Sequence, residues 1–213
     1  MRPTIEAVIM TTERFGTPHL DALRASNPGL KVHVNKGRHG TTEAERQTLW
    51  RNCDRAIRDW WRSNRDRVQA PSVAFLEWDV LCNAPLSGLM PPFTGLVGRI
   101  VAPFDHDPGW VWFREVERLP EALRPFATSL RPLGALIASR PCLDAIASPE
   151  FDDLFAADIF CELRLPTLAR FLGFPIRASD AFRRVECFPI PHPGPAPGIW
   201  HAVKSACNLD PSP

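Results

Sequence analysis

The sequence lacks the glycine-rich motifs of two large nucleotide-binding classes. Neither G-x-x-x-x-G-K-[ST] nor G-x-G-x-x-G occurs in its 213 residues, which disfavours a P-loop protein and a dinucleotide-binding Rossmann site. G-x-S-x-G is absent as well, and no serine stands out as the nucleophile of a hydrolase. Tyrosine is missing altogether, which we attribute to coding bias rather than to chemistry.

The cysteine spacing of a zinc site, a strong net charge and an apolar segment long enough to cross a membrane are missing too. The six cysteines form no C-x-x-C pair, so the spacing of a zinc site is absent. The net charge of +1 gives no sign of a nucleic-acid partner. No stretch approaches the roughly 20 apolar residues of a transmembrane segment, and residues 1–12 are wrongly flanked for a signal peptide. These absences favour a cytoplasmic protein.

What is present is an alternation of strand and helix patterns. Near-continuous apolar runs at residues 5–10, 30–34 and 73–81 predict buried strands. A helix at residues 42–67, opened by a capping box of Thr42 and Glu45, precedes the third of them. This order predicts an α/β fold in one domain, residues 1–213: a three-layer α/β/α sandwich with a mainly parallel central sheet.

The second half of the chain is less regular. Apolar runs predict strands at residues 98–103, 110–114 and 133–139. A helix is expected from Asp153 to Leu163, broken at Pro166 and restarted afterwards. Alternating prolines in residues 188–198 suit an exposed polyproline-like loop.

The third apolar run ends in two acids, Glu77 and Asp79, on either side of Trp78. Successive strand side chains point to opposite faces, so the two carboxylates are expected on one side. In open α/β sheets, ligands bind outside the carboxyl ends of the strands. Oxygen ligands there suit Mg²⁺ or Mn²⁺ together with a substrate phosphate. The alternative is a strand that leaves the core through ordinary surface acids.

A β/α half that delivers an acid-x-acid motif resembles the GT-A family of glycosyltransferases. In that family a D-x-D motif binds the divalent metal and the ribose and diphosphate of the donor. The resemblance implies a nucleotide-binding half at residues 1–90, an acceptor half at 91–190 and a C-terminal lid at 191–213. Glu77 replaces the first Asp, so Asp79 is the better metal ligand, and Glu77 and Trp78 are assigned to the donor.

The same resemblance assigns further side chains to the donor and the metal. In such enzymes a C-terminal histidine often adds a metal ligand, which here implies His201, and Lys204 is placed near the diphosphate. The other donor-binding candidates follow the first two strands or lie on the long helix, where a turn or a solvated face is the alternative. They are Thr11, Thr12, Arg14, Asn35, Arg51 and Asp54.

Two acids are candidates for the base that activates an acceptor hydroxyl. Asp158 and Glu162 are four residues apart, hence on one face of a predicted helix, and Asp153 is an alternative. The predicted activity is metal-dependent transfer of a sugar from a nucleoside-diphosphate sugar to an unknown glycan, lipid or small-molecule acceptor. The rival functions are a sugar-nucleotide nucleotidyltransferase and a non-catalytic nucleotide-sugar-binding module. The first usually needs a glycine-rich basic loop that residues 11–16 lack.

Overall fold

The computed structural model describes residues 5–11, 16–34, 50–89, 93–186 and 197–203. The main sheet contains β1 (Ile5–Thr11), β2 (Lys31–Val34), β3 (Ser72–Glu77), β5 (Leu96–Gly98), β8 (Ala135–Ser139) and β9 (Ile176–Ala178). A second sheet contains the short strands β4 (Leu81–Cys82), β10 (Arg184–Val185) and β11 (Ile199–His201), and β6 (Ile100–Pro103) pairs with β7 (Thr128–Arg131).

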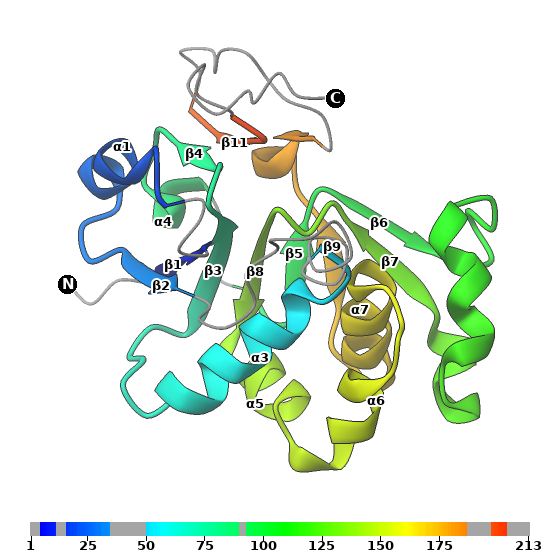
Figure 1. The fold of residues 1–213 in the computed structure, drawn as a ribbon. Coiled ribbons are helices and arrows are strands. Elements are labelled where there is room, and N and C mark those ends of the chain that lie inside the picture. Colours follow the sequence, from blue (N-terminus) through cyan, green and yellow to red (C-terminus); the bar gives the residue numbers. More distant parts are fainter. Residues whose placement is uncertain (1–4, 12–15, 35–49, 90–92, 187–196, 204–213) are drawn as a thin grey trace.

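Helices connect these strands (Figure 1). The α-helices are α1 (Leu20–Ser26), α3 (Cys53–Asn64), α4 (Leu86–Leu89), α5 (Arg140–Ile146), α6 (Asp152–Ala156) and α7 (Cys161–Phe171). The 3-10 helices are η1 (Val111–Arg118), η2 (Glu121–Phe126), η3 (Pro149–Phe151) and η4 (Asp180–Phe182). Among the described residues, no helix has both the length and the apolar character needed to cross a membrane.

The main sheet is mainly parallel, as predicted. Its strand order is β2-β1-β3-β8-β5-β9. β1 runs parallel to both β2 and β3, and β5 runs parallel to β9. β8 runs antiparallel to both of its neighbours, β3 and β5. The remaining five strands therefore point the same way, and the carboxyl ends of β1 and β3 lie side by side, with Met10 opposite Glu77.

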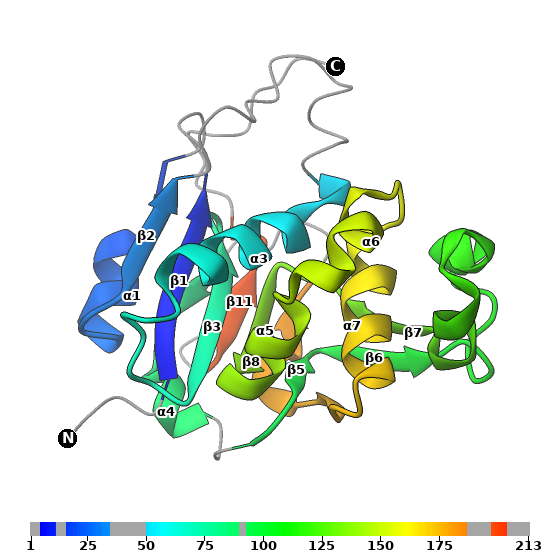
Figure 2. The ribbon, with the colours of Figure 1, turned by 90° about the horizontal axis from the view of Figure 1, so that it is seen from below.

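Alternate strand residues feed two separate cores, one on each face of the main sheet. Val73 and Phe75 pack with α3, α5 and α7, whereas Ala74 and Leu76 pack with α1, α4 and the second sheet. Figures 1 and 2 show the larger helices gathered on one face. Because every residue from Val73 to Leu76 is buried, β3 shows the continuous apolar run of a strand covered on both sides. The α/β/α prediction is confirmed.

Several predicted boundaries were wrong. The predicted strand at 110–114 is instead η1, where Phe113 and Val116 are buried at the three-residue spacing of a 3-10 helix. The predicted helix break at Pro166 is absent, because α7 continues through that residue. Burial of residues 161–169 offsets a proline cost of about 3 kcal/mol. The chain breaks earlier, between α6 and α7.

The long helix predicted at 42–67 is seen in part. α3 begins at Cys53 and ends at Asn64, and the capping box of Thr42 and Glu45 lies outside the described residues. The C-terminal lid predicted at 191–213 is described only for residues 197–203. The proposed halves at 1–90 and 91–190 stay a prediction.

Candidate metal centre

Three side chains that offer metal-binding atoms meet at the carboxyl end of β3. Glu77 is the last residue of β3, Asp79 lies in the turn that follows, and His201 ends β11. One ligand atom from each residue lies within 4.8 Å of the others. His201 Nε2 is 3.0 Å from Glu77 Oε2 and 3.3 Å from Asp79 Oδ1. The structure thus brings together Asp79 and His201, the predicted metal ligands, and adds Glu77 to them.

A turn, rather than the pleat of a strand, brings the two acids to one side. β3 ends at Glu77, and the Val80 amide donates to the Glu77 carbonyl at 3.1 Å. The predicted strand at 73–81 was therefore too long. β4 follows the turn directly and pairs with β11, with Leu81 opposite Trp200. The Val203 amide also donates to the Asp79 carbonyl at 2.9 Å. These backbone hydrogen bonds position His201 beside the two acids.

The second ring nitrogen of His201 fixes the orientation of the imidazole. Nδ1 is 2.7 Å from the backbone carbonyl oxygen of Glu186. A carbonyl only accepts hydrogen bonds, so Nδ1 carries a proton and Nε2 faces the carboxylates. This is the second interaction that metal-binding histidines usually have. The neutral ring would thus present its Nε2 lone pair to a cation.

Gly134 provides the floor against which the His201 ring packs. A Cβ atom at Gly134 would lie 2.5 Å from His201 Cε1 and 2.6 Å from each ring nitrogen. The Gly134 carbonyl also accepts a hydrogen bond from the Glu77 amide at 2.8 Å. One backbone position therefore sets the place of two of the three candidate ligands. Gly134 is not among the residues predicted from the sequence, although a glycine beside an apolar strand can mark a close approach.

The charges around His201 determine its protonation. Burial alone would lower the pKa of His201, but the hydrogen bonds and charges of Asp79 and Glu77 outweigh burial and raise that pKa to about 10. Asp79 is 2% exposed and His201 7%, whereas the Glu77 side chain is 34% exposed. The centre therefore opens on the Glu77 side. The two carboxylates concentrate negative charge, which a proton on His201 or a divalent cation can neutralise.

Glu162 is a buried acid near this centre. Its carboxylate accepts a hydrogen bond from the Leu133 amide at 3.0 Å, and Leu133 precedes Gly134. Burial, and to a lesser extent the charge of Glu77, raise the pKa of Glu162 to about 7. The Leu133 amide and the charges of Arg131 and His201 act in the opposite direction. An acid with a pKa near neutrality is the kind of group that general acid–base chemistry uses.

Asp158 does not share a helix face with Glu162, contrary to the prediction. Asp158 lies between α6 and α7, whereas Glu162 is in the first turn of α7. The Asp158 side chain is 74% exposed and pairs with Arg51 at 3.1 Å and Arg118 at 3.2 Å. Asp153, the alternative, is exposed on α6. Glu162 is therefore buried, whereas Asp158 is exposed and paired with two arginines.

The candidates on the long helix form internal ion pairs. Asp54 and Arg164 are fully buried, with Asp54 Oδ1 2.6 Å from Arg164 Nη2. Asp54 is a predicted donor-binding residue, and its carboxylate has no exposed surface in this structure. Arg51 pairs with the buried Glu115 at 2.8 Å as well as with Asp158. Its guanidinium is committed to protein acids.

Two donor-binding candidates lie at the same sheet edge as the centre. Thr11 ends β1 beside the Met10–Glu77 register pair, is 5% exposed, and donates its hydroxyl proton to the Gly16 carbonyl. Trp78 is half-buried in the turn between Glu77 and Asp79. Four other candidates lie outside the described residues: Thr12, Arg14, Asn35 and Lys204.

Comparison with known proteins gives matches in structure only. No protein-family model matches the sequence, and no curated protein does. One similar solved structure is a glycosyltransferase involved in the glycosylation of the major capsid of PBCV-1, with 12% identity and a TM-score of 0.40. That match covers 72% of this chain and 66% of the other. Another is mouse xyloside xylosyltransferase 1 in its apo form, with 8% identity, a TM-score of 0.39, and coverage of 84% of this chain and 86% of the other. Because both TM-scores are low, the functional proposal below depends on the geometry of the centre alone.

Proposed function

We propose that this chain is a metal-dependent glycosyltransferase that takes its sugar from a nucleoside-diphosphate sugar. The observation that carries the proposal is the meeting of Glu77, Asp79 and His201 at the carboxyl end of a central strand. Open α/β sheets bind their ligands at that edge. Two carboxylates and an imidazole suit a divalent cation. Because the Glu77 side chain is partly exposed, such a cation would keep coordination positions for a phosphate ligand.

The donor set fits Mn²⁺ or Mg²⁺. Asp79 and His201 would hold the ion from the buried side, and Glu77 would either complete the set or accept a hydrogen bond from the donor ribose. When bound, the cation would stabilise the negative charge that develops on the departing diphosphate. In this proposal Thr11 and Trp78, at the same edge of the sheet, would contact the nucleotide.

Glu162 is the better of the two candidates for the base that accepts the proton of the acceptor hydroxyl. Its pKa of about 7 lets the carboxylate form at neutral pH and still accept a proton readily. Asp158 is exposed, and its carboxylate oxygens already accept hydrogen bonds from Arg51 and Arg118. The acceptor would then lie on the α7 side of the centre.

The first test measures metal binding and donor turnover in matched variants. Asp79→Asn removes one carboxylate charge without changing the size of the side chain, so we expect Mn²⁺ affinity to fall at least about tenfold, the equivalent of 1.4 kcal/mol. Metal-dependent hydrolysis of the donor should be lost. Glu150→Gln, an exposed acid on η3, is the control and should bind as the original protein does. Equal Mn²⁺ affinity in Asp79→Asn would refute the proposal.

A second test separates the proposed reaction from the two rival functions. The protein is incubated with a panel of nucleoside-diphosphate sugars and Mn²⁺, and release of the diphosphate is measured. Parallel samples contain nucleoside triphosphates and sugar 1-phosphates, which a nucleotidyltransferase would join. Calorimetry with UDP and GDP, with and without Mn²⁺, identifies a binding module. Release of diphosphate supports the proposal. Formation of a sugar nucleotide, or binding without turnover, contradicts it.

A further inference from the structure

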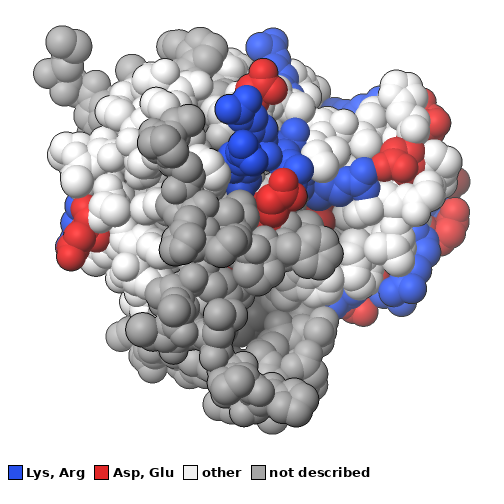
Figure 3. Space-filling model, turned by 90° about the horizontal axis from the view of Figure 1, so that it is seen from above, with Lys and Arg blue, Asp and Glu red and all other residues white. Residues whose placement is uncertain are grey.

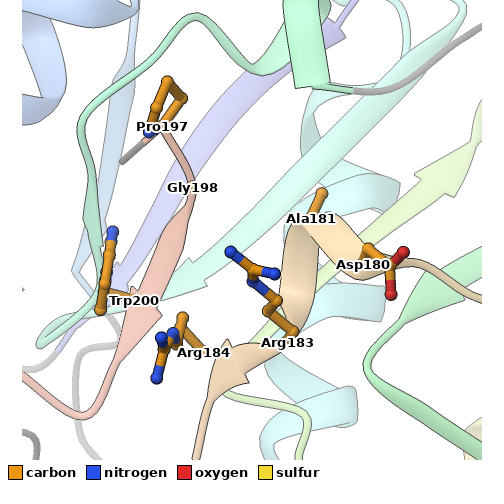
Figure 4. A pocket seen from close by; sticks show the side chains of 7 residues that line it. All are labelled: Asp180, Ala181, Arg183, Arg184, Pro197, Gly198 and Trp200. Atoms are coloured by element: carbon orange, nitrogen blue, oxygen red, sulfur yellow. The ribbon is translucent and has the colours of Figure 1, made fainter. Parts of the chain in front are cut away.

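A small pocket lies beside the second sheet, apart from the candidate metal centre. It is bounded by η4, β10 and the start of β11, and its walls include Arg183, Arg184, Gly198 and Trp200 (Figure 4). Trp200 and His201 are consecutive in β11, so their side chains point to opposite faces of the strand. The pocket has a volume of about 30 Å³, which admits one small chemical group and excludes a whole sugar or base.

The charge of the pocket is positive. Arg183 and Arg184 are exposed, and within the described part of the chain neither guanidinium lies in an ion pair with an acid. Among the described wall residues Asp180 is the one acid, so these residues carry two positive charges and one negative charge. Figure 4 shows both guanidinium groups extending to the side on which Trp200 lies. Figure 3, seen from the side on which Figure 1 shows the second sheet, shows a group of basic side chains with acidic side chains among them.

Trp200 adds a hydrogen-bond donor to the pocket. Trp200 is 6% exposed, and its Nε1 has no hydrogen-bond partner among the described residues. In Figure 4 the indole nitrogen is turned toward Gly198, another wall residue. The Arg184 guanidinium lies over the indole ring, 5.4 Å from its centre. Buried indole N–H groups usually have a partner, so an acceptor supplied by a ligand would complete this site.

We propose that this pocket binds the terminal phosphate of a phosphorylated ligand. Two guanidinium groups and an indole N–H are donors only, so they select a group that carries several acceptor oxygens. Guanidinium groups match phosphate oxygens in pairs, and such charge-assisted bonds are strong. A phosphate also carries up to two negative charges, which matches the two arginines. The ligand is either free phosphate or the phosphate end of a larger molecule.

The test follows the indole N–H signals of the seven tryptophans by NMR in ¹⁵N-tryptophan-labelled protein. Trp200→Phe identifies the Trp200 signal by its absence. Inorganic phosphate, glucose 1-phosphate and sodium chloride at equal ionic strength are titrated with EDTA present, so that the metal centre cannot bind phosphate through a cation. We expect the Trp200 signal to move in a saturable way with the phosphates and not with chloride. Tighter binding of glucose 1-phosphate would identify a phosphorylated sugar rather than free phosphate.

Matched arginine variants make the result decisive. Arg183→Gln/Arg184→Gln should weaken phosphate binding at least about tenfold in calorimetry, whereas Arg177→Gln on β9, an exposed arginine that is not among the pocket walls, should not. All three positions are exposed, so the variants are expected to fold, which thermal melting checks. Equal phosphate affinity in the double variant, or a Trp200 shift that never saturates, overturns the proposal. Asp79→Asn should leave this binding unchanged, so the two proposals fail independently.

Discussion

The imidazole of His201 packs directly on the backbone of Gly134, so closely that no side chain fits between them. A Cβ at Gly134 would be 2.5 to 2.6 Å from three atoms of the ring. The same glycine accepts the Glu77 amide proton at 2.8 Å. A residue without chemical function of its own therefore positions two of the three candidate metal ligands, Glu77 and His201.

Gly134→Ala should weaken Mn²⁺ binding at least about tenfold, because the His201 ring must leave its place between Glu77 and Asp79. Such overpacking typically also costs about 1–3 kcal/mol of the free energy of unfolding. Calorimetry measures the affinity, and urea unfolding measures stability. Gly109→Ala is the control, because a Cβ there would meet no atom within 4 Å. Unchanged Mn²⁺ affinity in Gly134→Ala would show that the ring position does not matter.

Glu162 should make stability depend on pH in a defined window. Its pKa is 4.5 in the unfolded chain and about 7 when folded, so the folded state binds the proton more tightly. Binding of this proton stabilises the folded state fully below about pH 4.5. The free energy of unfolding should therefore fall as pH rises from about 4.5 to about 7, and the stabilisation is absent at higher pH. The total is about 3 kcal/mol at 1.36 kcal/mol per pKa unit.

Glu162→Gln tests this window. We expect the variant to gain stability relative to the original protein as pH rises from 4.5 to 8, measured by urea unfolding at each pH. The glutamine oxygen can still accept the Leu133 amide proton, so the comparison isolates the charge. Glu150→Gln, at an exposed acid on η3, should show a constant difference. A constant difference for Glu162→Gln as well would contradict the raised pKa.

The two candidate bases should respond differently in donor-to-acceptor transfer. If Glu162 accepts the acceptor proton, Glu162→Gln should lower kcat by about 10²- to 10⁴-fold and remove the rise of rate with pH near 7. Asp158→Asn should change kcat less than about threefold, because its exposed carboxylate is already paired with Arg51 and Arg118. Steady-state kinetics between pH 5 and 9 measure both. The reverse ranking would assign the role to Asp158.

The buried pair of Asp54 and Arg164 should support the fold and leave metal binding alone. Asp54→Asn leaves a guanidinium with no exposed surface without its counter-charge, which typically costs about 3–5 kcal/mol. Asp54→Leu/Arg164→Met removes both charges and should recover most of that stability. Urea unfolding measures these differences. Mn²⁺ affinity should equal that of the original protein wherever the variant is folded, and a specific loss of donor binding would support the predicted donor-binding role of Asp54.

Local patterns in the sequence predicted the central strands. The continuous apolar runs at 5–10 and 73–81 contain most of β1 and most of β3. A strand buried on both faces needs apolar side chains at consecutive positions, so the sequence shows it directly. Local patterns failed where tertiary packing reversed them. The apolar residues at 110–114 predict a strand, but most of them form η1. Pro166 predicts a helix break, but it lies inside α7. Helix charge patterns could not distinguish a solvated face from Asp54 buried against Arg164.

By itself, the sequence determined the α/β character of the fold and the presence of two acids at the end of a central strand, since both depend on neighbours along the chain. Only the tertiary structure decided that Glu77 joins Asp79 and His201, because residues 124 positions apart meet through the pairing of β4 with β11. It also decided that Gly134 must have no side chain, and that Glu162 is buried while Asp158 is exposed. Distance in space, burial and the electric field of neighbouring groups arise only when the chain has folded, and these quantities set the chemistry of the centre.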